Sequence, residues 1–262
     1  MRIALGLEYD GAKYCGWQSQ ANGGAIQDCL EHALQKMANH TLRVSAAGRT
    51  DAGVHALSQI VHFDTLTTRP MSAWVRGVNA NLPDSIRVLW AQAVDARFHA
   101  RFDAQQRSYQ YLLINQPVAP AVMAGKAGWF HLPLDIGAMQ FAAEYLLGQH
   151  DFSAFRAAEC QAKSPVKFMH RASVVQIGNG YLFDFCAGAF LHHQVRNMVG
   201  ALVYIGKGKY KPEYMETLLA SRDRRLSPPT FSPAGLYLTG VGYDAMWDLP
   251  ETERTLNFGC LV

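Results

Sequence analysis

The chain has 262 residues, which fits one large domain or two small ones and allows a sizeable hydrophobic core. Hydrophobic residues make up 49% of the sequence and charged residues 17%, a balance that excludes an intrinsically disordered protein. Lys and Arg outnumber Asp and Glu by only 24 to 21, so binding to a nucleic acid would require a focused basic patch.

Two further classes are disfavoured by the pattern of residues. No uninterrupted apolar run is long enough for a transmembrane helix, and the start shows no signal-peptide pattern, so we expect a cytoplasmic protein. The five cysteines are scattered without a CxxC pair, which argues against a disulfide framework and against a zinc site. We therefore expect reduced thiols and no metal.

The first half of the chain alternates predicted strands and helices. Apolar alternation and helical periodicity, bounded by turn residues, predict strands over 2–9, 43–47, 58–64 and 86–93, and helices over 25–40 and 71–79.

The second half mixes the same elements. The pattern predicts strands over 108–115, 172–177, 181–186 and 235–242, and helices over 134–147 and 190–205. Gly178-Asn179-Gly180 is typical of a hairpin turn between two of these strands. Because helices and hairpins are intermixed, an α+β fold is favoured over a doubly wound parallel sheet. The polar stretch 103–107 predicts a boundary between an N-terminal half, 1–104, and a C-terminal half, 105–262.

The densest cluster of chemically active residues runs from Ala46 to Ala56, between two predicted strands. There Gly48 and Gly53 bracket Arg49 and Asp51, and glycines permit close approach of a ligand. Arg49 is a candidate phosphate ligand and Asp51 a candidate nucleophile or base. The alternative is an ordinary turn with a surface ion pair. A metal site at Asp51 and His55 would need a third ligand that the sequence does not single out.

A second cluster alternates basic and aromatic residues, Arg97-Phe98-His99-Ala100-Arg101-Phe102. Guanidinium groups bind phosphates and aromatic faces stack on bases, although a solvated strand or loop would show the same composition. Tyr109 and Tyr111 share one face of the next predicted strand, where either core packing or stacking on a base is possible.

Arg196 lies in an apolar stretch of the predicted helix 190–205, and a largely buried arginine needs a partner. Asp51 is a candidate for that partner, and such a pair would hold the carboxylate ionised. Lys207, Lys209 and Lys211 form a basic loop, which is more often a solvated surface than a binding site.

Several of these blocks together resemble the tRNA pseudouridine synthase I family, the bacterial A-type enzymes. Gly48-Arg49-Thr50-Asp51-Ala52-Gly53-Val54-His55 resembles the family's catalytic motif. The remaining matching blocks occur in the family's order along nearly the whole chain: Glu8-Tyr9-Asp10-Gly11 with Gly16-Trp17-Gln18, Gly77-Val78-Asn79-Ala80-Asn81-Leu82-Pro83, Phe98-His99-Ala100-Arg101-Phe102, Tyr109-Gln110-Tyr111, and Phe190-Leu191-His192-His193-Gln194-Val195-Arg196-Asn197.

The resemblance implies a fold, an activity and partners. The expected fold has two α/β halves related by a pseudo-twofold, which share an extended, mostly antiparallel sheet with a central basic cleft. The expected activity is conversion of uridine to pseudouridine at positions 38, 39 and 40 of the tRNA anticodon stem-loop, without a cofactor. A homodimer that binds tRNA across both subunits is also implied, with no membrane partner.

The resemblance also implies roles for individual residues. Asp51 would be the catalytic nucleophile, attacking C1′ or C6 or removing the 2′ proton. Arg49 would enter the space left by the flipped uridine. Tyr109 would stack on the uracil ring and assist proton removal from C5, and Arg196 would pair with Asp51. The block Phe98, His99, Ala100, Arg101 and Phe102 would line the RNA path.

Two other classes remain possible from the residues. An RNA-binding module without chemistry would use the same basic and aromatic residues and would not require Asp51. A nucleoside hydrolase using Asp51 and His55 would turn over free uridine and would lack a basic cleft.

Overall fold

The structure is a computed structural model that describes residues 1–21 and 23–256, and the chain divides into two units. Unit 1 comprises Met1–Gln106 and Tyr237–Leu256, and unit 2 begins at Arg107 and ends at Leu236. The sequence division placed residues 105–262 in one half, whereas the chain returns to unit 1 after Leu236. Among the described helices, none combines the length and the apolar character needed to cross a bilayer.

Unit 1 is built on a sheet in which the central strand is buried on both faces. The strand order is β4 (Ile86–Val94), β1 (Arg2–Tyr9), β3 (His55–Asp64) and β10 (Leu236–Gly242). The pairs β4–β1 and β1–β3 are antiparallel and β10 runs parallel to β3, while β2 (Ser45–Ala46) pairs with β3. Consecutive residues Ile3, Ala4 and Leu5 are fully buried, as a strand covered on both sides requires.

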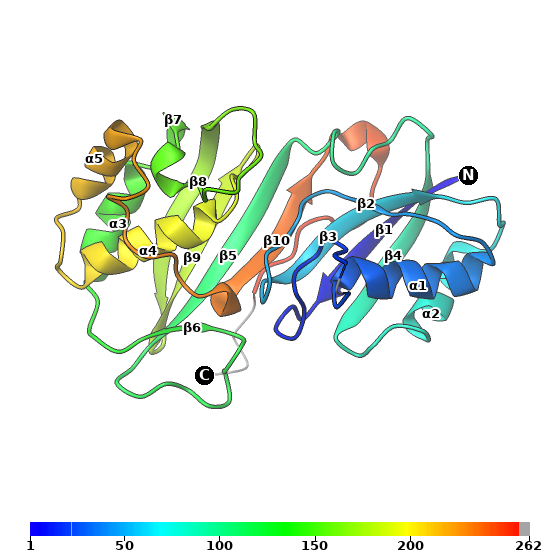
Figure 1. Ribbon diagram of the computed structural model, residues 1–262, viewed down its shortest axis with the longest axis horizontal. Helices are drawn as coiled ribbons and strands as arrows, with labels where there is room; N and C mark the ends of the chain where they lie inside the picture. Colours follow the sequence, from blue (N-terminus) through cyan, green and yellow to red (C-terminus); the bar gives the residue numbers. More distant parts are fainter. Residues whose placement is uncertain (22, 257–262) are drawn as a thin grey trace. The chain divides into compact units, whose positions relative to one another are not determined.

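Two helices, α1 (Ile26–Ala38) and α2 (Met71–Asn79), pack together in unit 1, with α2 also against β4 (Figure 1). The stripe of buried residues on α1 includes Ile26, Leu30 and Leu34, which share one helical face. The Asp28 carboxylate accepts a hydrogen bond from the Ala25 amide at 3.3 Å at the start of α1, and Asn39 ends the helix with a left-handed φ of 58°.

Unit 2 has an antiparallel sheet in the order β5 (Gln106–Asn115), β9 (Gly180–Ala187), β8 (Val166–Ile177) and β7 (Gly148–Asp151). A short strand, β6 (Gly128–Phe130), runs parallel to β5. The helices α3 (Ile136–Glu144), α4 (Gln194–Gly206) and α5 (Tyr214–Ser221) pack on one another, and α3 also contacts β8 (Figure 1). Helices and mostly antiparallel strands therefore coexist in both units, which confirms the α+β class.

The predicted helix over 190–205 begins four residues too early, and the predicted strand over 172–177 begins six residues too late, because β8 starts at Val166. The helix begins only at Gln194, because His193 has a left-handed φ of 62° and the Gln194 side chain accepts a hydrogen bond from the Leu191 amide at 2.8 Å. The residues before it form a turn that apolar periodicity does not reveal. The sequence analysis also missed β6, β7 and α5, which are short.

Candidate functional site

The loop that carries Asp51 connects β2 to β3 and is tied to the sheet along its backbone. The Ala47 amide donates to the carbonyl of Ile60 at 2.8 Å, and the Gln59 side chain donates to the carbonyl of Gly48 at 2.7 Å. The Val54 amide closes the turn by donating to the carbonyl of Asp51 at 3.1 Å. Because each tie is to buried β3 or within the loop, the backbone around Asp51 has little freedom.

Thr50, the residue before Asp51, is held by both its side chain and its backbone. Its hydroxyl lies 2.8 Å from the hydroxyl of Tyr9 at the end of β1, and its carbonyl accepts from the Trp17 amide at 3.0 Å. Burial raises the pKa of Tyr9 to about 12, against the lowering effect of its hydrogen bonds with Thr50 and Gln59. Tyr9 therefore stays protonated at physiological pH and remains a hydrogen-bonding partner for Thr50.

Gly16 allows the segment Gly16-Trp17-Gln18 to pack closely against the loop that carries Asp51. Its φ is 101°, a conformation that favours glycine, and a Cβ at this position would lie 2.8 Å from the Thr50 carbonyl oxygen and 3.1 Å from the Asp51 carbonyl carbon. The early block of the sequence therefore contacts the backbone of Thr50 and Asp51 directly.

Asp51 itself is half-buried and Arg49 is exposed, so both side chains reach solvent from the fixed loop. His55 differs from them, because only 2% of its surface is exposed. Its Nδ1 accepts from the Gly11 amide at 3.1 Å, and its ring stacks on Tyr237 at a centroid distance of 4.6 Å. His55 is therefore buried and tied to neighbouring residues, and its Nδ1 also lies 3.1 Å from Asp10 Oδ1. This burial disfavours a hydrolase that uses Asp51 with His55.

The two tyrosines of β5 separate into different roles. Tyr111 is fully buried, donates from its hydroxyl to the Ser232 carbonyl at 2.9 Å, and has its pKa raised above the usual range by burial. Tyr109 is 8% exposed and packs edge-to-face on Phe190 at 5.2 Å. Tyr111 is therefore a core residue, and Tyr109 is the better candidate for contact with a base.

Arg196 is half-buried on α4, and its Nε donates to the carbonyl of Phe231 at 2.9 Å. Asp51 belongs to unit 1, whereas Arg196 and Tyr109 belong to unit 2. The pairing of Asp51 with Arg196 therefore stays a prediction from the sequence.

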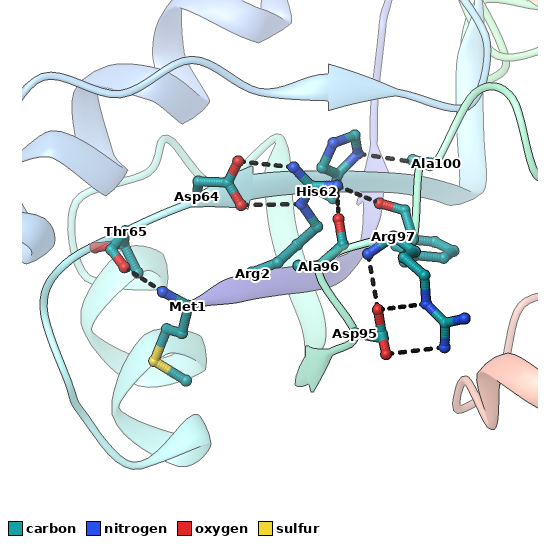
Figure 2. A network of polar contacts seen from close by, with 10 residues as sticks. Met1, Arg2, His62, Asp64, Thr65, Asp95, Ala96, Arg97 and Ala100 are labelled. Atoms are coloured by element: carbon teal, nitrogen blue, oxygen red, sulfur yellow. Dashed lines mark hydrogen bonds and ion pairs between the residues drawn. The ribbon is translucent and has the colours of Figure 1, made fainter.

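The block from Phe98 to Phe102 is a tight turn, and Figure 2 shows its residue Ala100 hydrogen-bonded to His62 of β3, with Arg2 of β1 nearby. Arg2 donates from Nε and Nη2 to the carboxylate of Asp64, at 2.9 and 2.8 Å. Its third nitrogen, Nη1, donates to the Phe98 carbonyl at 2.8 Å. The Ala100 amide donates to Nδ1 of His62 at 3.1 Å. Burial is the main cause that lowers the pKa of His62 to about 4, so the ring is neutral and accepts this bond at neutral pH.

This arrangement corrects part of the predicted RNA path. Phe98 and Ala100 are fully buried, so their side chains form core rather than a surface for direct RNA contact. His99 is half-buried, and its Nδ1 accepts from the amides of Arg101 and Phe102 at 3.2 and 3.3 Å. Arg101 and Phe102 are exposed, and Phe102 stacks on His99 at 4.2 Å. The block thus presents one cation and one aromatic ring on a rigid turn.

Sequence reasoning missed the residues that hold these two features. Tyr9, Thr50 and Gln59 support the Asp51 loop, and Arg2, Asp64 and His62 support the turn of Arg101. Two features of the sequence could have indicated them. Tyr9 and Thr50 lie inside the blocks that resemble the family, and Gln59 is a polar residue in the predicted strand over 58–64.

Comparison with known proteins agrees with this geometry. A family model described as tRNA pseudouridine synthase matches residues 7–103 and 142–244. A relative from Methylobacillus flagellatus is 74% identical over 259 residues, covering 99% of both chains. One from Dechloromonas aromatica is 59% identical over 261 residues, covering 100% of both. Both relatives carry the name tRNA pseudouridine synthase A.

A solved structure, titled a crystal structure of a Cbf5-Nop10-Gar1 complex, matches with a TM-score of 0.35 and 11% identity, covering 90% of this chain and 49% of that chain. The family model and the full-length relatives define an RNA-modifying isomerase. The chain belongs to the tRNA pseudouridine synthase family, and the resemblance predicted from its sequence blocks is confirmed.

Proposed function

We propose that this enzyme converts uridine to pseudouridine at positions 38, 39 and 40 of the tRNA anticodon stem-loop, with Asp51 as the catalytic nucleophile. The observation that carries the proposal is the half-buried carboxylate of Asp51 on a loop whose preceding residues are hydrogen-bonded to β1 and β3 and whose turn is closed by the Val54 amide on the Asp51 carbonyl. A group that is held in place before substrate binds loses little entropy during the reaction. This prior orientation can lower the activation free energy substantially.

Pseudouridine formation requires such a carboxylate and few other chemical groups. The N1–C1′ glycosidic bond breaks, the uracil turns, C5 bonds to C1′, and the proton on C5 leaves to restore the ring. No electrons are gained or lost, so the reaction needs no redox cofactor, and the family resemblance implies no cofactor of any kind. Asp51 could attack C1′, attack C6, or remove the 2′ proton, and all three routes begin with an ionised carboxylate beside the ribose and the ring.

The other predicted residues complete the proposal. The exposed Arg49 would occupy the space that the flipped uridine vacates, because it precedes Asp51 by two residues on the same fixed loop. Tyr109 would stack on the uracil ring and assist loss of the C5 proton, and Arg196 would hold the carboxylate ionised. Arg101 and Phe102 would contact the RNA, one through a phosphate and the other by stacking. We also propose a cytoplasmic homodimer that binds the tRNA body as well as the stem-loop.

The test is release of tritium from tRNA labelled at C5 of uridine, since only substitution at C5 frees that hydrogen. Asp51→Asn keeps the shape of the side chain and removes the nucleophile, so turnover should vanish while tRNA affinity stays within a few fold. Asp84→Asn is the matched control, because Asp84 is an exposed carboxylate paired with Arg87 at 2.5 Å. Near wild-type turnover by Asp51→Asn would refute the mechanism and favour an RNA-binding role for this loop.

The position of modification needs a separate measurement. Anticodon stem-loops inside full-length tRNA, each with a single uridine at position 38, 39 or 40, should all release tritium. A tRNA whose uridines all lie outside these positions should release none. Release from the last substrate at a comparable rate would contradict the assigned positions without affecting the assigned chemistry. Sedimentation equilibrium of the purified chain would test the homodimer.

A further inference from the structure

The side chain of Arg196 is attached to a loop that lies directly on α4. Its Nε donates to the Phe231 carbonyl at 2.9 Å, and the Phe231 amide donates back to the Arg196 carbonyl at 3.2 Å. Further along the helix, a Cβ added to Gly200 would collide with the Pro229 carbonyl oxygen, so helix and loop touch through their backbones. The orientation of the Arg196 guanidinium therefore depends on where the loop over 227–231 holds the Phe231 carbonyl.

A second arginine, Arg224, holds that loop. Its Nη1 donates to the carbonyls of Ser227 and Pro228, at 2.9 and 3.1 Å. Its Nη2 donates to the Thr230 hydroxyl at 3.0 Å and to the side-chain oxygen of Asn197 at 3.1 Å. The Thr230 hydroxyl in turn donates to the same oxygen of Asn197 at 2.7 Å. One guanidinium thus joins three residues of the loop to the helix residue that follows Arg196.

Among the described residues, the four acceptors of Arg224 are all neutral oxygens, which is unusual for a half-buried arginine. Burial without a carboxylate partner disfavours the charged form, and it lowers the pKa of Arg224 below its usual range. The neighbouring Arg225 shows the ordinary alternative, since it is exposed and pairs with Asp223 at 2.6 Å. Asn197, on which the network ends, is fully buried and also donates to the Phe155 carbonyl at 2.7 Å. The network is therefore anchored in the core of unit 2.

We propose that Arg224 is a positioning residue for Arg196, acting through the loop over 227–231 and the Phe231 carbonyl. Because Nε donates to that carbonyl, the plane of the Arg196 guanidinium is set by the loop. Planar, two-point pairing with a carboxylate depends on such an orientation. This inference rests on the proposed role of Arg196 in catalysis.

The experiment compares Arg224→Gln and Thr230→Val in two backgrounds, the natural chain and Arg196→Gln. The single-turnover rate of tritium release, with tRNA saturating, is measured beside the melting temperature. In the natural background each variant should slow the reaction roughly tenfold to a hundredfold, the range for a reacting group that is displaced. Arg225→Gln removes an adjacent arginine outside the network and should leave the rate unchanged.

The Arg196→Gln background distinguishes positioning from stability. It has no guanidinium to orient, so Arg224→Gln and Thr230→Val should slow it by less than about threefold, while the loss in melting temperature should be the same in both backgrounds. An equal slowing in both backgrounds would overturn the inference and leave Arg224 a structural residue. If Arg196→Gln alone reacted at the natural rate, the proposed role of Arg196 would fail, and this inference with it. Thr230→Val supplies the answer if Arg224→Gln does not fold.

Discussion

Replacing Tyr9 by Phe removes one hydroxyl from beneath the Asp51 loop and leaves the ring in place. Within the described part of the chain, the buried Thr50 hydroxyl has no hydrogen-bond partner other than Tyr9, at 2.8 Å. Gln59 keeps its bond to the Gly48 carbonyl at 2.7 Å and loses only a long contact of 3.4 Å. Tyr9→Phe therefore leaves a single polar atom unsatisfied, next to Asp51 in the chain.

The structure sets the size of the expected effect. An unsatisfied buried hydroxyl costs about 1–3 kcal/mol of unfolding free energy. For a chain of this length, each kcal/mol lowers the melting temperature by about 2–4 °C. Because Thr50 is also freed to turn, the adjacent carboxylate loses its fixed position, and we expect turnover at saturating tRNA to fall roughly tenfold. Urea unfolding and tritium release on the same preparation measure the two effects.

Tyr14→Phe is the matched control for this prediction. It removes a similar hydroxyl, bonded to Ser85 at 2.6 Å, which lies outside the Asp51 loop. Both variants should lose stability, but only Tyr9→Phe should lose turnover. If the two variants lost stability alike and both turned over normally, the Tyr9–Thr50 bond would have no part in holding Asp51, and the reasoning would be refuted.

Three further outcomes are expected. Arg101→Ala should lower the log–log slope of tRNA affinity against salt concentration by about 0.7–0.9. Arg97→Ala should lower this slope less, because Arg97 is already paired with Asp95 at 3.0 Å. Equal slopes for the two variants would contradict an RNA contact by Arg101. Tyr109→Phe should bind tRNA normally and react slowly, and Tyr109→Leu should also lose about 1–3 kcal/mol of binding; a Leu variant that only melts early would make Tyr109 a core residue. Since the pKa of His62 is lowered to about 4 from 6.5, unfolding free energy should fall as pH drops from about 6.5 to 4, and His62→Asn should flatten this part of the profile in urea titrations at each pH.

The regular elements could be predicted because their residues repeat with a clear period. The strand over 2–9 and the helix over 71–79 match β1 and α2 residue for residue. The start of α4 could not be found, because it depends on a left-handed His193 and on a side-chain bond from Gln194, neither of which alters the apolar pattern. Local periodicity reports burial, and it does not report where a single backbone angle ends a helix.

The candidate site shows the same division. The motif around Asp51 was visible because glycines and charged residues are unusual between two strands. The burial of Phe98 could not be predicted, because an alternation of basic and aromatic residues does not indicate which of the aromatic side chains face the core. The supports at Arg2 and Asp64 lie 62 residues apart in the sequence, and only the pairing of β1 with β3 brings them together.

The return of the chain to unit 1 has a consequence for synthesis on the ribosome. The strand carrying Gln59 lacks its parallel neighbour β10 until residues 236–242 emerge, and the Ser58 hydroxyl lacks the Thr252 carbonyl, to which it donates at 2.9 Å. Unit 2 intervenes with about 130 residues, which take roughly 6–26 s to translate. During this interval the start of β3, at His55 and Ala56, lacks its partner strand and is open to pairing with other chains, while unit 2 is continuous and can close first. A nascent chain that stops before β10 therefore carries Asp51 on an unfinished sheet.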